Sequence, residues 1–195
     1  GARADYEAAL PIYRQIDDRL GEANALTSIG QLCAAHGDLA AGFRTVAQGL
    51  QIRQQINDQA GIGASHGYLA RIAAQAGDLP QMIGLAARAI RIFAAIGDCF
   101  GQSLALNDLG RALLPGNTQV AVACLLHAEA LARAIGHPMS EEIASFVSKL
   151  RPDDVAVDEF AAAVAELAAY AEAIVAGLFA QSAAAVAADL VYLNV

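Results

Sequence analysis

Large side chains and prolines are scarce in this sequence of 195 residues. It has no tryptophan, six phenylalanines, five tyrosines and five prolines, although 56% of its residues are hydrophobic. Much of that hydrophobic content is alanine, which favours helices more than any other residue, whereas proline breaks them. The composition therefore predicts an all-α fold of closely packed helices. The length suits one compact domain or one short repeat array.

Basic residues are also few, since 12 lysines and arginines stand against 20 acidic residues and the net charge is −8. Nucleic-acid binding needs clustered positive charge. No basic stripe occurs here, so we expect no nucleic-acid partner.

Residues with the spacing of a catalytic or metal site are lacking. Cys33, Cys99 and Cys124 form no C-x-x-C pair, and the four histidines form no H-E-x-x-H motif. No nucleophile–base–acid set is visible. We therefore predict no catalytic residue, metal ligand or cofactor, and expect Cys33, Cys124 and His66 to be structural. An odd number of cysteines without a disulfide framework fits a reducing, cytoplasmic location.

The sequence has no apolar signal segment at its start, and one uncharged stretch near its end. That stretch, 173–188, is shorter than the roughly 20 residues that span a bilayer. We predict a packing helix there and no membrane association.

Three segments of the chain repeat at an interval of 40 residues. Ile16, Ile56 and Ile96 share this spacing, and an aspartate and a glycine follow each of them at fixed distances. Gly37-Asp38-Leu39 recurs as Gly77-Asp78-Leu79, and then as Gly116-Asn117, one residue early. A deletion therefore falls in the third copy. Repeats of this length indicate stacked helical units.

Each marker has a role at a helix end. Glycine suits the C′ position, where φ is positive, and aspartate suits the N-cap of the next helix. The markers predict helices at 4–16, 19–36, 39–55, 59–76, 79–95, 99–114, 118–134 and 139–150. Apolar residues follow helical spacing within them, such as Leu26, Ile29 and Cys33.

The pattern resembles the tetratricopeptide repeat in a long form of about 40 residues. Ile29-Gly30, Leu69-Ala70 and Leu109-Gly110 match its large–small pair, and Gly49, Ala89 and Ala128 match its small residue in the second helix. The resemblance implies a right-handed superhelix of antiparallel helix pairs. It gives a half repeat at 4–16, repeats at 19–56, 59–96 and 99–135, a partial fourth at 138–150, and a tail at 151–195.

Residues 16–26 are also similar in style to repeats of actinobacterial antibiotic-regulatory and STAND-type regulators. This similarity implies that the chain is part of a larger regulatory protein. The helix at 4–16 looks like the second helix of an earlier repeat, whose first helix would lie upstream.

The resemblance further implies that the first helix of each pair lines a concave binding face. Its inward side chains would be Asn24, Thr27, Gln31, Arg71, Asn107 and Arg111. The arginines could bind an acidic or carboxylate-bearing protein or peptide, and the asparagines a peptide backbone. Alternatively, the arginines pair with nearby acids and the amides are simply solvated.

The tail lacks the repeat and is dominated by alanine and valine. A helix at about 155–180 would expose an apolar face, which the array itself, a second copy or a further domain would cover. We favour self-association through residues 155–190. The sequence thus indicates a non-catalytic protein-binding scaffold. A sensor that relays a peptide or small molecule to a separate effector domain stays open, as does, more remotely, an enzyme with a site in the tail.

Overall fold

The computed structural model describes residues 1–151, 165 and 173–180. Every regular element among these residues is an α-helix. The helices are α1 (Ala2–Gln15), α2 (Arg19–Ala35), α3 (Leu39–Gln55), α4 (Gln59–Gln75), α5 (Leu79–Ala95), α6 (Cys99–Leu113), α7 (Thr118–Ala134) and α8 (Met139–Ser148). Residues 173–180 are helical as well, with Val175 buried. The predicted all-α class is confirmed, and the eight predicted helices all occur.

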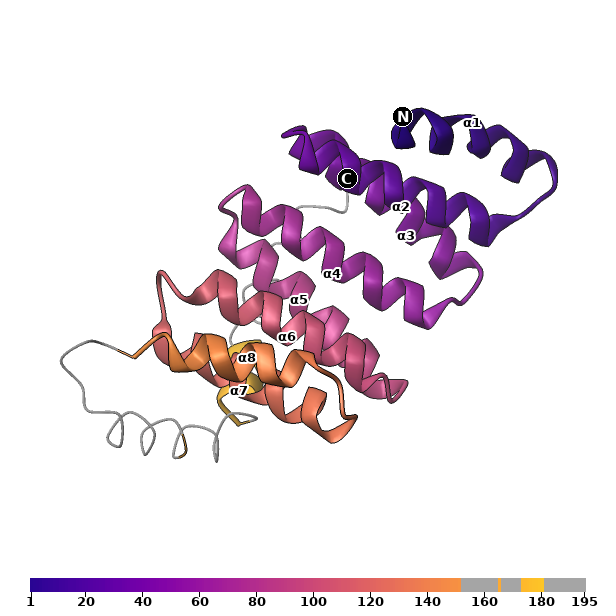
Figure 1. Ribbon diagram of the computed structural model, residues 1–195. Coiled ribbons are helices and arrows are strands. Elements are labelled where there is room, and N and C mark those ends of the chain that lie inside the picture. The colour runs from indigo at the N-terminus through magenta and orange to yellow at the C-terminus, as the bar shows by residue number, and fades with distance from the viewer. Residues whose placement is uncertain (152–164, 166–172, 181–195) are drawn as a thin grey trace. The chain divides into compact units, whose positions relative to one another are not determined.

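The chain divides into two compact units, Gly1–Ile96 and Gly97–Val195. In the first unit α2 packs with α3 and α4 with α5, while α3 contacts α4 and α1 contacts α2 (Figure 1). In the second unit α6 packs with α7, and α7 with α8. Adjacent helices therefore pack in pairs, as a helical repeat array requires.

The helices begin where the repeat markers predict. Six side chains cap a helix by accepting a hydrogen bond from the backbone N–H three residues on. They are Asp18, Asp38, Asp58, Asp78, Asp98 and Asn117. Such a cap satisfies an N–H that has no partner within the helix.

The helices end in turns with one residue in the left-handed region. Gly37 has φ 89° and Gly77 has φ 77°, as predicted for C′ glycines. Asp38 N–H donates to the Cys33 carbonyl and Gly37 N–H to that of Ala34, which is the Schellman pattern.

The turn after α6 differs from this pattern. Gly116 does not have a positive φ, contrary to its assignment as the third turn marker. Instead the N–H groups of Gly116 and Asn117 both donate to the carbonyl of Leu113. The one-residue deletion leaves this turn too short for the Schellman geometry of the other copies.

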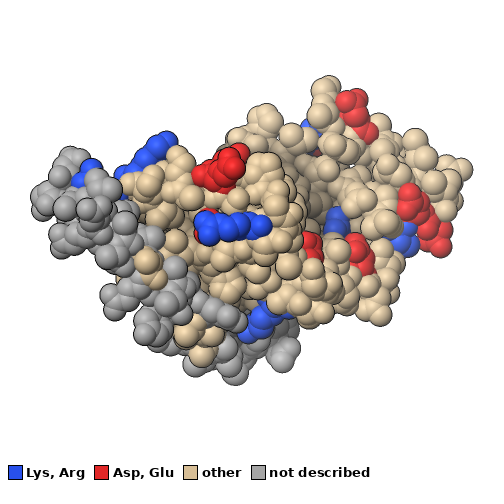
Figure 2. Space-filling model, turned by 60° about the horizontal axis from the view of Figure 1, so that its bottom comes forward, with Lys and Arg blue, Asp and Glu red and all other residues tan. Residues whose placement is uncertain are grey.

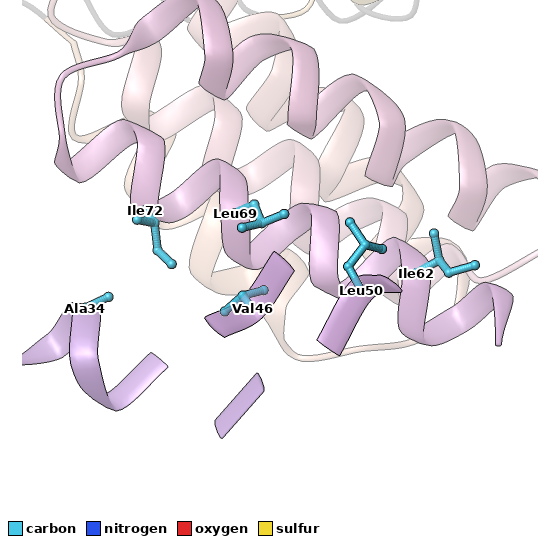
Figure 3. Close-up of a cluster of buried hydrophobic side chains, with 6 residues drawn as sticks. All are labelled: Ala34, Val46, Leu50, Ile62, Leu69 and Ile72. Atoms are coloured by element: carbon cyan, nitrogen blue, oxygen red, sulfur yellow. The ribbon is translucent and has the colours of Figure 1, made fainter. Parts of the chain in front are cut away.

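Small aliphatic side chains form the core between the pairs. Figure 3 shows six of them from α2, α3 and α4 that point toward one another: Ala34, Val46, Leu50, Ile62, Leu69 and Ile72. Cys33 and Cys124 are buried too, as predicted, and burial raises the pKa of the Cys124 thiol to about 12. The thiol therefore behaves as a small apolar side chain.

The tail prediction can be compared only in part. Within the predicted helix 155–180, residue 165 and residues 173–180 are helical. The rest of that segment, most of the proposed association region 155–190 and the final Val191–Val195 lie outside the described residues. Among the helices of the described part, none combines the length and apolar character of a membrane span.

Candidate functional site

The six residues predicted to face a ligand lie in both units. Asn24, Thr27 and Gln31 belong to α2 and Arg71 to α4, in the first unit; Asn107 and Arg111 belong to α6, in the second. Each unit therefore has its own candidate site.

Asn24 is exposed, but its amide is held by the neighbouring helix. Its Oδ1 accepts a hydrogen bond of 2.7 Å from Nη2 of Arg53 on α3. Arg53 is only 7% exposed, and its Nη1 lies 3.6 Å from Oδ2 of Asp58. Asn24 thus helps to neutralise the polarity of a buried arginine, and its acceptor oxygen is already occupied.

Thr27 does not face solvent, unlike the prediction. It is 4% exposed, and its hydroxyl donates to the Ala23 carbonyl one turn earlier. An added Cβ on Gly49 would lie 3.1 Å from the Thr27 oxygen, so this side chain packs against α3. Thr27 therefore belongs to the α2–α3 contact, whereas Gln31, one turn further, is exposed.

Arg71 is exposed on α4 and lies over an aromatic ring. Its guanidinium carbon is 4.7 Å from the centroid of Tyr68, three residues earlier on the same helix. Residues at this spacing are neighbours on a helix surface. The cation–π contact fixes the orientation of the guanidinium.

Arg111 has the same position in the next repeat and a more defined environment. Its guanidinium carbon is 3.9 Å from the centroid of Phe146 on α8, and its Nε donates to Asn107 Oδ1 at 3.1 Å. The two predicted site residues of α6 are therefore brought together, with an aromatic side chain from another helix. Arg111 itself remains exposed.

The rings under the two arginines were missed from the sequence. Phe146 follows Asn107 by 39 residues, the interval that applies after the third-copy deletion, so extending the register to the fourth copy would have placed it on the same face. Tyr68 lies outside the four inward positions chosen in its repeat. Only its spacing of three from Arg71 signals the contact.

Charges on the described surface are small in number and mixed in sign. On the face drawn in Figure 2, blue and red side chains form small groups between larger uncharged areas. In the first unit, buried Glu22 accepts hydrogen bonds of 2.7 Å from both Arg14 and Arg19. In the second, Arg133 pairs with Glu129, which is 8% exposed. These pairs join helices or helix turns.

The remaining chemistry-bearing side chains do not assemble into a reactive set. His66 is 7% exposed, its Nδ1 has no hydrogen-bond partner, and burial together with the charge of Arg88 lowers its pKa to about 4. Among the described residues, no three His, Cys, Asp or Glu side chains are grouped so that they could hold a metal ion. No protein-family model and no curated protein matches the chain.

Proposed function

We propose that the chain is a non-catalytic scaffold module that holds a protein or peptide through carboxylate groups. The observation that carries this proposal is the environment of Arg111, whose guanidinium lies between the Phe146 ring and the Asn107 amide. Its support is physical, because a prearranged guanidinium loses less conformational entropy on binding.

A guanidinium stacked on a ring directs its N–H bonds sideways, within its own plane. The Nε–H of Arg111 is used by Asn107, and the two terminal nitrogens form the fork that suits a carboxylate. Binding of this kind is bidentate and charge-assisted, which gives it both strength and orientation. A lysine at this position would supply the charge without the fork.

The recurrence of the arrangement supports binding to an extended partner. Arg71 and Arg111 are 40 residues apart, at one repeat position, and each lies over an aromatic ring. Repeat arrays present equivalent side chains at regular intervals along their binding surface. We propose a right-handed superhelix of the tetratricopeptide type, within a cytoplasmic regulatory protein, as the setting for this binding.

The proposal is tested with peptides selected on the immobilised full chain from a random display library. We expect the selected peptides to be rich in Asp and Glu or to require a free C-terminal carboxylate. Arg71→Ala with Arg111→Ala should weaken their binding at least about tenfold, the loss of one charged hydrogen-bonded pair. Arg111→Lys should restore only part of the affinity, since charge remains without the fork.

The matched control replaces two other exposed arginines, Arg44 on α3 and Arg91 on α5, by alanine. This variant has the same net charge as the double site variant but changes only second helices of the pairs. It should bind the selected peptides as the wild type does. Equal weakening by both variants would reduce the effect to net charge, and undiminished binding by the site variant would refute the proposal.

A further inference from the structure

Helix α1 has an exposed face whose counterparts in the other pairs are buried. The face consists of Ala2, Tyr6, Ala9 and Tyr13, none of which is buried, with Tyr6 39% exposed. The repeat register, 40 residues for the next two copies and 39 after the deletion, gives twelve equivalent residues on α3, α5 and α7. All twelve are buried: Gly42, Val46, Gly49, Arg53, Met82, Ala86, Ala89, Phe93, Ala121, Leu125, Ala128 and Ala132.

The equivalent faces are buried by the first helix of their own pair. A Cβ on Gly30 of α2 would lie 2.6 Å from Val46 on α3, and one on Gly110 of α6 would lie 2.8 Å from Leu125 on α7. A Cβ on Gly63 of α4 would meet the Phe93 ring at 2.9 Å. The same stripe is therefore covered by the same type of helix in all three pairs.

Ile12 shows the same contrast next to this stripe. It is 57% exposed, whereas its counterpart Ile52 is 7% exposed and packs in a cluster with Ala23 and Leu26 of α2. On the opposite side of α1, Leu10 packs against that cluster. Helix α1 is thus held by α2 on one side and uncovered on the side that a first helix covers elsewhere.

The packing also specifies the helix that would fit. Where the second helix has a large residue, Val46 or Leu125, the first helix has glycine opposite, Gly30 or Gly110. With Tyr6 at this position, close approach again requires glycine. The covering helices α2 and α6 share the pattern small–x–x–Leu–x–x–x–Gly, as in Ala23, Leu26 and Gly30.

The described part of a second copy does not offer such a helix. Helices α2, α4 and α6 already cover their own partners. Helix α8 has Glu142, Ser145 and Lys149 at the corresponding positions, and all three are exposed and polar. The occupant must therefore come from elsewhere.

We propose that the exposed face of α1, defined by Tyr6, Ala9 and Ile12, binds an amphipathic helix of a partner protein. That helix has the pattern small–x–x–Leu–x–x–x–Gly and places its glycine against Tyr6. It extends the array by completing the half pair that α1 begins. This surface is separate from the arginine sites, so neither proposal depends on the other.

The probe is a labelled peptide with the sequence of residues 18–36, in which Ser replaces Cys33; its binding to the full chain is followed by fluorescence anisotropy. We expect saturable binding at one peptide per chain. Tyr6→Glu and, separately, Ile12→Glu should each weaken it at least about tenfold, because an acid would be buried without a partner. A peptide with Gly30→Leu should lose binding to the same extent.

Leu79→Glu is the matched control, since Leu79 is 42% exposed at the start of α5 and lies outside this face. It should bind the peptide as the wild type does. Binding that is indifferent to Tyr6 and Ile12 would mean that the peptide replaces α2 on α3, and it would overturn the proposal, as would no binding. A wild-type dimer in light scattering that Tyr6→Glu dissociates would assign the face to a second copy and overturn it as well.

Discussion

His66 occupies a position that leucine holds in the neighbouring repeats, Leu26 before it and Leu106 after it. All three side chains are buried. The histidine is neutral in this environment because burial disfavours its charge and Arg88 repels it, which lowers its pKa from 6.5 to about 4. One buried position of the second repeat is thus sensitive to pH.

The consequence for stability follows from the direction of the shift. Between pH 6.5 and 4 the unfolded chain binds a proton at His66 and the folded chain does not, so acid favours unfolding. We expect the His66 contribution to be fully present above pH 6.5. It should be lost as the pH falls toward 4, by up to roughly 3 kcal/mol. Urea unfolding at a series of pH values measures this loss.

His66→Leu, the residue of both neighbouring repeats, is the informative variant. It should reduce the dependence on pH between 6.5 and 4 and increase stability at acidic pH, since no buried imidazole has to be protonated. A pH dependence identical to that of the wild type would show that other groups are responsible.

The residue scale is also where prediction from the sequence was weakest. The register placed Asn24 and Thr27 one turn from each other on the expected inner face, but Arg53 occupies the first and α3 buries the second. Both outcomes depend on contacts with α3, a separate helix. Periodicity within α2 states which side a residue is on, but the distance to the next helix decides whether it is exposed.

At the scale of the helices, prediction was accurate because the signals are local. A capping aspartate and a C′ glycine act within a few residues of the helix end, so their repetition at 40 residues located nearly every boundary. The turn at Gly116 shows the limit of this reasoning. There the residues recur but the loop is one residue shorter, and the backbone closes it with a different hydrogen-bond pattern.

The pairing of helices predicts opposite effects for two glycines in first helices. Gly30→Ala should destabilise the fold by about 1–2 kcal/mol, because the new Cβ would lie 2.8 Å from the backbone oxygen of Gly42. Gly67→Ala on α4 should stabilise it by about 0.5–1 kcal/mol, because nothing lies within 4 Å of the new Cβ and alanine favours the helix. Urea unfolding of both variants checks the two signs. Effects of equal sign would contradict the close approach of α2 and α3.

At the scale of the whole chain, burial is distributed unevenly between elements. Helix α1 has no buried residue, α3 has six and α4 has nine. The repeat explains this difference within the first unit, because stability in a repeat array comes from contacts between neighbours and α1 has a neighbour on one side only. The sequence indicated that α1 is half of a pair, but the exposure of Tyr6 and Ile12 is a property of the folded chain.

Amide hydrogen exchange should therefore rise in protection from α1 to α4. We expect the amides of α1 to exchange through local opening, well before those of α3 and α4, which need a larger unfolding event. Mass spectrometry of peptides from a timed exchange resolves these helices. Adding the 18–36 probe peptide should slow exchange in α1 in the wild type, and not in Tyr6→Glu. Protection of α1 equal to that of α3 in the absence of the peptide would mean that its apolar face is already covered, and that the half pair is complete without a partner.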